Sequence, residues 1–318
     1  METEEKLQLV KRNTVEIVTE EELRDMLEKR QMPSVYCGYE PNGPVHLGHL
    51  VTIIKLMDFD RAGFRVKVLL ADVHAFLNRK GSEEELNEEI EGWKKALRAI
   101  GLNAEIVLGS SFEFSQEYQL DVMRLARACT INRGLRSMQE IARDVEHATI
   151  SQLWYPLMQV VDIKYLDVDV AVGGIEQRKV HMIGRDEAAV HKHPFVAVHT
   201  PLITSLKGPG QKMAKTLPGS AVSVTDSYEE IRETVKSAYC PERVAQENPI
   251  LEIAKLVIFP MVGEMDIERP VRFGGDVSYS SYDQLEADFV EGKLHPLDVK
   301  TAVTQVLERM IAPIRKNM

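Results

Sequence analysis

Short apolar runs alternate with amphipathic stretches over the first two hundred residues of the chain. The apolar runs are typical of buried strands, and the stretches with apolar residues at helical spacing are typical of surface helices. The predicted strands are 34–38, 65–71, 104–108, 168–172 and 195–198, and the predicted helices are 16–28, 45–59 and 83–100, with another beginning near 176. Strands that alternate with crossover helices predict an α/β fold with a doubly wound parallel sheet.

The pattern becomes helical in two further regions. Residues 115–151 predict helices only, and residues 155–166 are apolar nearly all round, so we expect a buried helix with Pro156 at its first position. Beyond Val224 the composition changes, and the rest of the chain again predicts helices, with loops at 273–276 and 295–298. We therefore predict a first domain of residues 1–223, with a helical insertion at about 115–151, and a helical domain of residues 224–318.

Composition and charge limit the size of the protein's core, its cellular compartment and the partners that it can bind. The chain has 318 residues, 44% of them hydrophobic, which is enough for two domain cores. Three widely spaced cysteines predict a reducing compartment and no cysteine metal site. The sequence has no long apolar run and no apolar signal segment near Met1, so we expect a cytoplasmic protein without a membrane span. The net charge of −10 argues against nucleic-acid binding over the whole surface but permits a local docking face.

His46 and His49 stand at the start of the helix that follows the first long strand. Because they are three positions apart, their imidazoles share one face of the helix. The N–H groups and dipole of a helix start suit a phosphate, and Gly48 removes a side chain where a flat ring or a ribose could approach the backbone. The alternative is a pair of solvated histidines at an ordinary helix start.

Polar residues on the buried helix form a second candidate feature. Tyr155, Gln159 and Asp162 follow one another at helical spacing and form a single stripe. Buried polar groups need partners, which either a polar ligand or an internal hydrogen-bond network would supply. The carboxyl ends of two predicted strands, where open α/β sheets bind ligands, carry further candidates. These are Asp72, His74, Gly173, Gly174 and Gln177, of which His74 could also be an ordinary loop histidine.

Two motifs resemble those of class I aminoacyl-tRNA synthetases. His46-Leu-Gly-His49 resembles the HIGH motif of that class, and Lys212-Met-Ala-Lys-Thr216, in a loop rich in Gly and Pro at 208–220, resembles its KMSKS motif. Ala214 and Thr216 replace serines, which removes one hydroxyl and keeps both lysine charges. The longer run of residues 36–49 is more similar to archaeal and eukaryotic tyrosyl-tRNA synthetases than to their siblings, and the similarity extends from about residue 13 to the C-terminus.

The resemblance implies a Rossmann-like catalytic domain, a homodimer and roles for individual residues. The implied catalytic residues are His46, Gly48, His49, Lys212 and Lys215. The implied ATP-binding residues are Gly38, His46, His49, Lys212, Met213 and Lys215. The implied tyrosine-binding residues are Tyr36, Gly38, Glu40, His74, Tyr155, Gln159, Asp162 and Gln177.

The resemblance also implies contacts with tRNA. The implied tRNA-binding residues are Arg136 at the acceptor stem, Arg178 and Lys179 on the phosphate backbone, and Phe273, His295 and Asp298 around the first anticodon base. The alternatives are ordinary surface charges for Arg178 and Lys179. For the last three they are a core position for Phe273 and a helix that begins at Pro296, with Asp298 at its N-terminal end.

The implied reaction has two steps: tyrosine attacks the α-phosphate of ATP, and the tyrosyl group then passes to the terminal ribose of tRNA(Tyr). Mg²⁺ would accompany the ATP phosphates, and no protein-bound metal is expected. Asp162 would accept the proton of the phenol and Tyr36 would donate to its oxygen, which favours tyrosine over tryptophan. Two other interpretations remain open: a nucleotidylyltransferase that shares only the His-x-Gly-His motif, and a tRNA-binding paralogue without catalysis.

Overall fold

The computed structural model describes residues 1–78, 82–138, 149–210, 213 and 217–318. The chain forms two compact units, each built from several segments. The first comprises Met1–Asn42, Lys55–Lys94 and Leu102–Pro201, and the second comprises Gly43–Ile54, Lys95–Gly101 and Leu202–Met318. The functional division at residue 223 stays a prediction.

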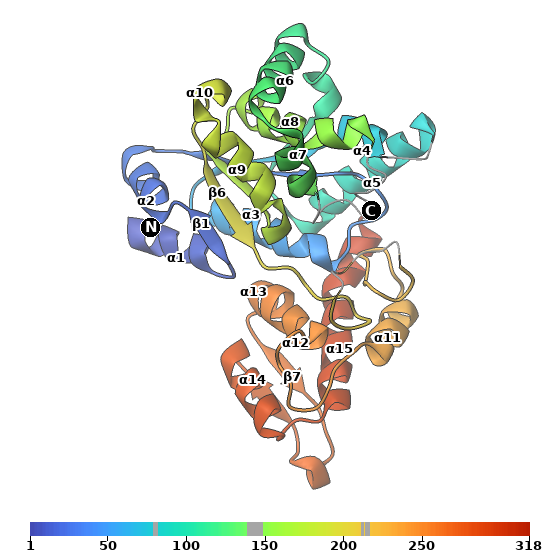
Figure 1. The fold of residues 1–318 in the computed structure, drawn as a ribbon. Coiled ribbons are helices and arrows are strands. Elements are labelled where there is room, and N and C mark those ends of the chain that lie inside the picture. The colour runs from blue at the N-terminus through green and yellow to red at the C-terminus, as the bar shows by residue number, and fades with distance from the viewer. Residues whose placement is uncertain (79–81, 139–148, 211–212, 214–216) are drawn as a thin grey trace. The chain divides into compact units, whose positions relative to one another are not determined.

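A six-stranded sheet forms the centre of the first unit (Figure 1). Its strands are β1 (Glu16–Val18), β2 (Ser34–Tyr39), β3 (Arg65–Leu70), β4 (Glu105–Leu108), β5 (Val170–Gly174) and β6 (Val196–Thr200). The spatial order is β1-β6-β5-β2-β3-β4, with every pair parallel except β1 and β6. The strand order reverses between β2 and β5, so their carboxyl ends form the position at which doubly wound sheets bind ligands. The predicted fold class is confirmed.

Helices pack against this sheet and against one another. They are α1 (Thr3–Lys11), α2 (Glu20–Lys29), α3 (Leu47–Arg61), α4 (Asp72–Asn78), α5 (Glu83–Ile100), α6 (Gln116–Ala128), α7 (Ile131–Met138), α8 (Ile150–Tyr165), α9 (Arg178–Asp186) and α10 (Ala188–His191), with single turns at Gly109–Ser111 and Ile175–Gln177. Ile163 and Leu166 at the end of α8 are buried against the sheet, in a cluster with Tyr36, Leu69 and Ala171. On another face, α8 packs against α6 and α9 through Val122, Val161 and Ile183. This central helix is therefore buried, as its sequence predicts.

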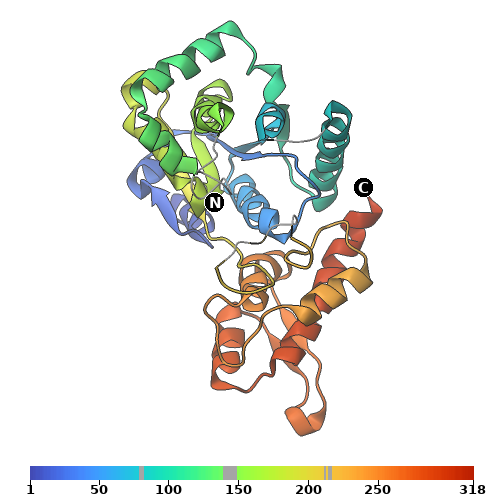
Figure 2. The same cartoon turned by 45° about the vertical axis from the view of Figure 1, so that its right-hand side comes forward.

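The C-terminal segment, orange to red in Figures 1 and 2, is mainly helical. Its elements are α11 (Tyr228–Ser237), α12 (Pro249–Ile253), a π-helical turn (Ala254–Ile258), α13 (Phe259–Val262), β7 (Met265–Ile267), a 3₁₀ turn (Val271–Phe273), β8 (Val277–Tyr279), α14 (Tyr282–Glu291) and α15 (Pro296–Lys316). The longest, α15, buries Val299, Val303 and Leu307 along one face. The antiparallel pair β7–β8 was not predicted, because strands of three residues are too short to show a pattern.

Two local predictions are wrong, and in both cases a capping residue marks the true start of the helix. Residues 16–18 form strand β1 beside β6, and the helix begins only after Thr19, whose side chain accepts from the N–H of Glu22. Helix α8 begins at Ile150 after a capping box of Thr149 and Gln152, so Pro156 lies inside the helix. A proline is favoured at a helix start because it lacks an N–H, but the capping box identifies the true start six residues before Pro156.

Candidate functional site

Asp162, the acidic residue of the predicted stripe, is completely buried, with 0% of its surface exposed. Its Oδ1 accepts a hydrogen bond of 2.7 Å from the hydroxyl of Tyr118 in α6. Its Oδ2 is buried without a hydrogen-bond partner among the described residues. The expectation that Tyr36 alone is the neighbour of this carboxylate was incomplete. Tyr118 escaped the sequence prediction because its ring also fits the ordinary apolar face of an amphipathic helix.

His74 lies between two buried carboxylates. Its Nδ1 is 3.6 Å from Oε1 of Glu113, and its Nε2 is 3.7 Å from Oδ2 of Asp162. His74 belongs to helix α4 and is 1% exposed, so it is not an ordinary loop histidine. Glu113 follows the carboxyl end of β4 and was not predicted, because a glutamate after a strand is common at surfaces. We refer to Glu113, His74 and Asp162 as the buried triad.

The buried triad is also a group of three possible metal ligands, whose atoms lie within 4.8 Å of one another. The two ring nitrogens of His74, however, face different carboxylates. A single metal ion takes one nitrogen of an imidazole, whereas a protonated imidazole offers both N–H groups as donors. The arrangement therefore suits an imidazolium between two acids better than a metal ion.

Burial and charge shift the proton affinities of the triad. Burial lowers the pKa of His74, but the contact with Glu113 and the charge of Asp162 outweigh it and raise the pKa to about 9. Burial, followed by the charge of Glu113, raises the pKa of Asp162 to about 8, against the opposing effect of His74. Burial and the charge of Asp162 also raise the pKa of the Tyr36 hydroxyl well above its usual value. These groups interact strongly, so their protons belong to the cluster as a whole.

A second polar group lies nearer the start of α8. The ring of Tyr155 meets the imidazole of His74 edge-on, with 4.5 Å between centroids, and its hydroxyl lies 3.5 Å from Oε2 of Glu40. Gln159 donates a hydrogen bond of 3.0 Å to the side chain of Gln177. Elements far apart in sequence thus bring Glu40, His74, Tyr155 and Asp162 into one chain of contacts, and Gln159 and Gln177 form a separate pair.

The remaining predicted residues of this region lie on β2. Tyr36 is 2% exposed and packs in the same core cluster as the end of α8. Gly38, two residues along, is exposed, and a Cβ there would meet only ordinary contacts with Leu69 and Tyr36. Gly38 therefore leaves open space beside the strand end, as a ligand that approaches the backbone requires.

His46 and His49 belong to the second unit, and their rings stack with centroids 3.7 Å apart. His46 Nδ1 accepts from the N–H of Gly48 at 3.1 Å. A Cβ on Gly48 would lie 2.9 Å from the His46 ring, so the flat group that needs this glycine is the imidazole itself. The backbone of the segment is fixed by bonds to residues 222–224, including Leu47 N–H to Val222 O at 2.9 Å.

The lysine loop falls largely outside the described residues. Lys212 and Lys215, as well as Ala214 and Thr216, are not among them, so their predicted roles remain predictions. Met213 is described: it is 5% exposed, and its N–H donates to the carbonyl of Ile203 at 3.0 Å. Its Cβ lies near the position that a Cβ of Gly48 would occupy. The two motifs therefore meet at Met213 and Gly48 within one unit.

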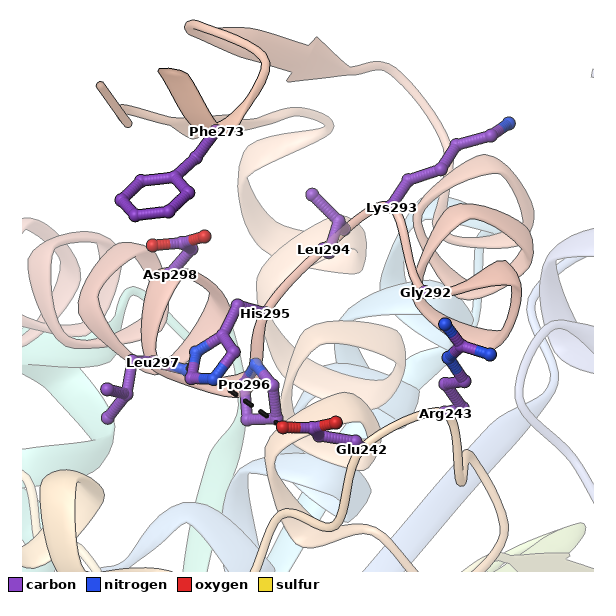
Figure 3. A pocket seen from close by; sticks show the side chains of 10 residues that line it. All are labelled: Glu242, Arg243, Phe273, Gly292, Lys293, Leu294, His295, Pro296, Leu297 and Asp298. Carbon is purple, nitrogen blue, oxygen red and sulfur yellow. Dashed lines mark hydrogen bonds and ion pairs between the residues drawn. The ribbon is translucent and has the colours of Figure 1, made fainter. Parts of the chain in front are cut away.

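A cavity of about 490 Å³ lies in the C-terminal segment, between the turn before β8 and the start of α15 (Figure 3). It is lined by Phe273, His295 and Asp298, the three residues predicted to hold a base, together with Glu242, Arg243, Gly292, Lys293, Leu294, Pro296 and Leu297. Phe273 is 57% exposed, so it is not a core residue. His295 caps α15 by accepting from the N–H of Leu297, with Pro296 at the first helical position, so the structural interpretation of these two residues also holds.

The predicted acceptor-stem and backbone contacts lie on exposed helix faces. Arg136 in α7 is exposed, and its Nε donates to the carbonyl of Asn132. Arg178 and Lys179, at the start of α9, are also exposed. The guanidinium of Arg178 already binds both carboxylate oxygens of Glu16, at 2.7 and 3.0 Å. This pairing makes Arg178 a weaker candidate for a phosphate contact than the sequence alone suggests.

Comparisons with known proteins agree with this geometry. The family model for tRNA synthetases class I (W and Y) matches residues 28–312. The chain belongs to this family. A tyrosine–tRNA ligase of Archaeoglobus fulgidus is 48% identical, over 100% of this chain and 99% of its own. One of Methanopyrus kandleri is 49% identical, over 99% and 98%. The chain is therefore an aminoacyl-tRNA synthetase that groups with the tyrosine–tRNA ligases.

Solved structures lead to the same grouping. The tyrosyl-tRNA synthetase of Archaeoglobus fulgidus, crystallised with L-tyrosine, matches with a TM-score of 0.95 at 48% identity and covers 99% of both chains. That of Pyrococcus horikoshii, also with L-tyrosine, matches with a TM-score of 0.91 at 35% identity, over 99% of this chain and 96% of its own. Among the described residues, no helix of this synthetase has the length and apolar character needed to cross a membrane.

Proposed function

We propose that this synthetase activates L-tyrosine with ATP and transfers it to the 3′-terminal ribose of tRNA(Tyr). The observation that supports tyrosine as the substrate is Oδ2 of Asp162, a buried oxygen that has no hydrogen-bond partner in the described part of the chain. The hydroxyl of tyrosine supplies the donor that this oxygen lacks, and phenylalanine does not. Leaving a buried acceptor without a partner costs about 1–3 kcal/mol or more, so phenylalanine is rejected.

The other polar side chains then hold the amino-acid end of the substrate. Tyr155, Gln159 and Gln177 bind the ammonium group, with Glu40 adding negative charge near it. Tyr36 donates to the phenol oxygen, Gly38 leaves room for the substrate and the adenylate, and His74 lines the pocket. Support comes from the contacts of 3.5–4.5 Å that join Glu40, Tyr155 and His74 to Asp162, and from the hydrogen bond of 3.0 Å between Gln159 and Gln177.

Adenylate formation needs the groups that bind ATP. In the proposed reaction the tyrosine carboxylate attacks the α-phosphate in line, and pyrophosphate leaves. His46 and His49, close over Gly48, bind the phosphate or ribose, while Lys212 and Lys215 neutralise the leaving phosphates together with Mg²⁺. Met213 lies beside Gly48 and links the two motifs. Such phosphoryl chemistry depends on positioning and charge stabilisation more than on a base.

Recognition of tRNA uses other surfaces in this proposal. Phe273 and His295 hold the first anticodon base in the C-terminal cavity, and Asp298 accepts from its edge. Arg136, Lys179 and, less favourably, Arg178 contact the acceptor stem and backbone. We also propose a homodimer, which the family resemblance implies, and a cytoplasmic location, which the cysteine usage supports.

Pyrophosphate exchange across the standard amino acids tests the first half of this proposal. Tyrosine alone should support exchange, and Lys212→Ala or Lys215→Ala should slow it about 10²-fold, as expected for loss of one transition-state charge contact. Tyrosine affinity, measured by calorimetry, should stay unchanged in both variants. Exchange without an amino acid would indicate a nucleotidylyltransferase, and tRNA binding with no exchange would indicate a paralogue without catalysis.

The anticodon part is tested separately. Phe273→Ala and Asp298→Ala should reduce aminoacylation of tRNA(Tyr) and leave tyrosine-dependent exchange unchanged. If exchange falls as far as aminoacylation does, the cavity is a structural feature of the fold.

A further inference from the structure

Arg243 combines three features that its place in the fold does not explain. Its φ of 60° lies in the left-handed region, which is uncommon for residues other than glycine and costs backbone strain. Its side chain lines the C-terminal cavity (Figure 3). A strained residue with an exposed cation on a cavity wall points to a ligand.

The guanidinium of Arg243 lies directly against Gly292. A Cβ at Gly292 would be only 2.6 Å from Nη2 and 2.7 Å from Cζ of Arg243. Gly292 ends α14 with a φ of 81°, so a glycine is favoured there on two grounds. The absence of a side chain at Gly292 allows the arginine to lie flat against the cavity wall.

The charge of Arg243 is not neutralised within the described residues, since no ion pair or hydrogen bond joins its guanidinium to them. Two other cations near the cavity have partners among the described residues. Lys293 pairs with Asp288 at 2.8 Å and with Glu291 at 2.7 Å. Arg269 donates to the carbonyls of Gly275 and Lys293, both at 2.6 Å, and so fastens the turn that carries Phe273.

The cavity therefore has two chemically different ends. Phe273 and Asp298 face one another at one end, and Arg243 stands beside Gly292 at the other, as Figure 3 shows. Glu242, which precedes Arg243 in the sequence, lies 3.6 Å from Nε2 of His295. In a nucleotide the base, sugar and phosphate follow one another in the same order: a flat ring with polar edges, a neutral sugar, then an anion.

We propose that Arg243 binds a backbone phosphate of the RNA whose base enters this cavity. The inference rests on the proposed anticodon role of the cavity. It adds an electrostatic contact between Arg243 and a phosphate, which does not depend on the identity of the base. A bidentate guanidinium–phosphate contact would offset the strain at this position and fix the RNA strand relative to the base.

The test is the binding of a labelled tRNA(Tyr) transcript to the full chain at several salt concentrations. Arg243→Gln keeps the length of the side chain and removes its charge, and Arg243→Gly in addition removes the strain. Both should weaken binding about tenfold near 0.1 M salt and reduce the slope of log K against log salt by about 0.7–1, as for the loss of one phosphate contact. Glu247→Gly is the matched control, because Glu247 has a φ of 50° and does not line the cavity.

Stability and specificity separate this inference from its alternatives. Arg243→Gly should melt no lower than wild type, which excludes loss of binding through unfolding. Arg243→Gln should weaken cognate tRNA and a transcript with an altered first anticodon base by the same factor, whereas Phe273→Ala and Asp298→Ala should reduce the preference for the cognate. If Arg243→Gln binds as wild type does, with an unchanged salt slope, the phosphate contact is wrong. If Phe273→Ala and Asp298→Ala bind as wild type does while Arg243→Gln binds more weakly, the base assignment is wrong and the phosphate contact is supported.

Discussion

Glu113→Gln tests the charge balance of the buried triad. The substitution keeps the shape of the side chain and removes the carboxylate that faces His74 Nδ1 at 3.6 Å. His74 has a folded pKa of about 9 against its ordinary value of 6.5. Its contribution to the free energy of unfolding is therefore fully present below about pH 6.5 and is lost as the pH rises through about 9. The difference between these two pKa values corresponds to about 3 kcal/mol.

Asp162 changes stability in the same direction. Its folded pKa of about 8 lies above the ordinary value of 3.8, so the folded state retains a proton that the unfolded chain loses near pH 4. Wild-type stability should therefore fall between about pH 6.5 and 9. Removing Glu113 lowers both pKa values, because its charge raises each of them. The fall in the free energy of unfolding over this pH range should then be smaller by about 2–3 kcal/mol in the variant.

Urea unfolding followed by circular dichroism at pH 6.5, 7.5, 8.5 and 9.5 measures this difference. Glu117→Gln, an exposed acid four residues further along, is the matched control for the loss of one negative charge. Equal pH dependence in wild type, Glu113→Gln and Glu117→Gln would refute the charge-paired imidazolium. His74 would then be neutral in the folded protein.

Two other substitutions give distinct readouts. Tyr118→Phe removes the hydroxyl that donates to Asp162 Oδ1 at 2.7 Å and should lower kcat/KM for tyrosine activation by the equivalent of about 1.5–3 kcal/mol. The control is Tyr165→Phe, because the hydroxyl of Tyr165 lies 3.4 Å from Asp121. Equal effects of the two substitutions would show that Asp162 does not contribute to substrate binding. Gly292→Ala should lower the free energy of unfolding by about 1 kcal/mol or more, because its φ of 81° disfavours a side chain and its Cβ would overlap Arg243. The double variant Gly292→Ala with Arg243→Gly, followed by thermal melts, separates these two causes. If the double variant is more stable than Gly292→Ala alone, the overlap with Arg243 causes part of the loss of stability. If it is not, the backbone conformation of residue 292 causes the loss.

The sheet could be predicted from the sequence because each long strand is a continuous apolar run between helices with a clear period. The run at Arg65–Leu70, for example, has four fully buried residues, and no other element fits it. Boundaries were less accessible where two signals competed. Residues 16–18 have helix-compatible spacing with the residues that follow. Thr19 marks where the helix begins, but the strand before it forms through pairing with β6, a long-range partner.

The candidate site shows a similar division. Asp162, Gln159 and Tyr155 could be found from the sequence because a buried helix makes any polar residue conspicuous. Tyr118 and Glu113 could not, since a tyrosine on an amphipathic helix and a glutamate after a strand are both common at surfaces. Their importance depends on the proximity of α6, the β4 end and α8, which periodicity does not encode.

In the proposed function, the two oxygens of Asp162 have different roles. Oδ1 is fixed by the Tyr118 hydroxyl, and Oδ2 lies 3.7 Å from Nε2 of His74 and has no hydrogen-bond partner among the described residues. Because the first bond holds the carboxylate in place, the second oxygen is an acceptor in a set position that needs no rearrangement when a hydroxyl arrives. A ligand without that hydroxyl leaves the oxygen desolvated. Sites built in this way reject the analogue that lacks the hydroxyl by about 10⁴–10⁵, a range for which tyrosyl-tRNA synthetases are themselves an example. In the proposed function, selectivity therefore depends on the fixed position of Oδ2, which lies 3.7 Å from Nε2 of His74.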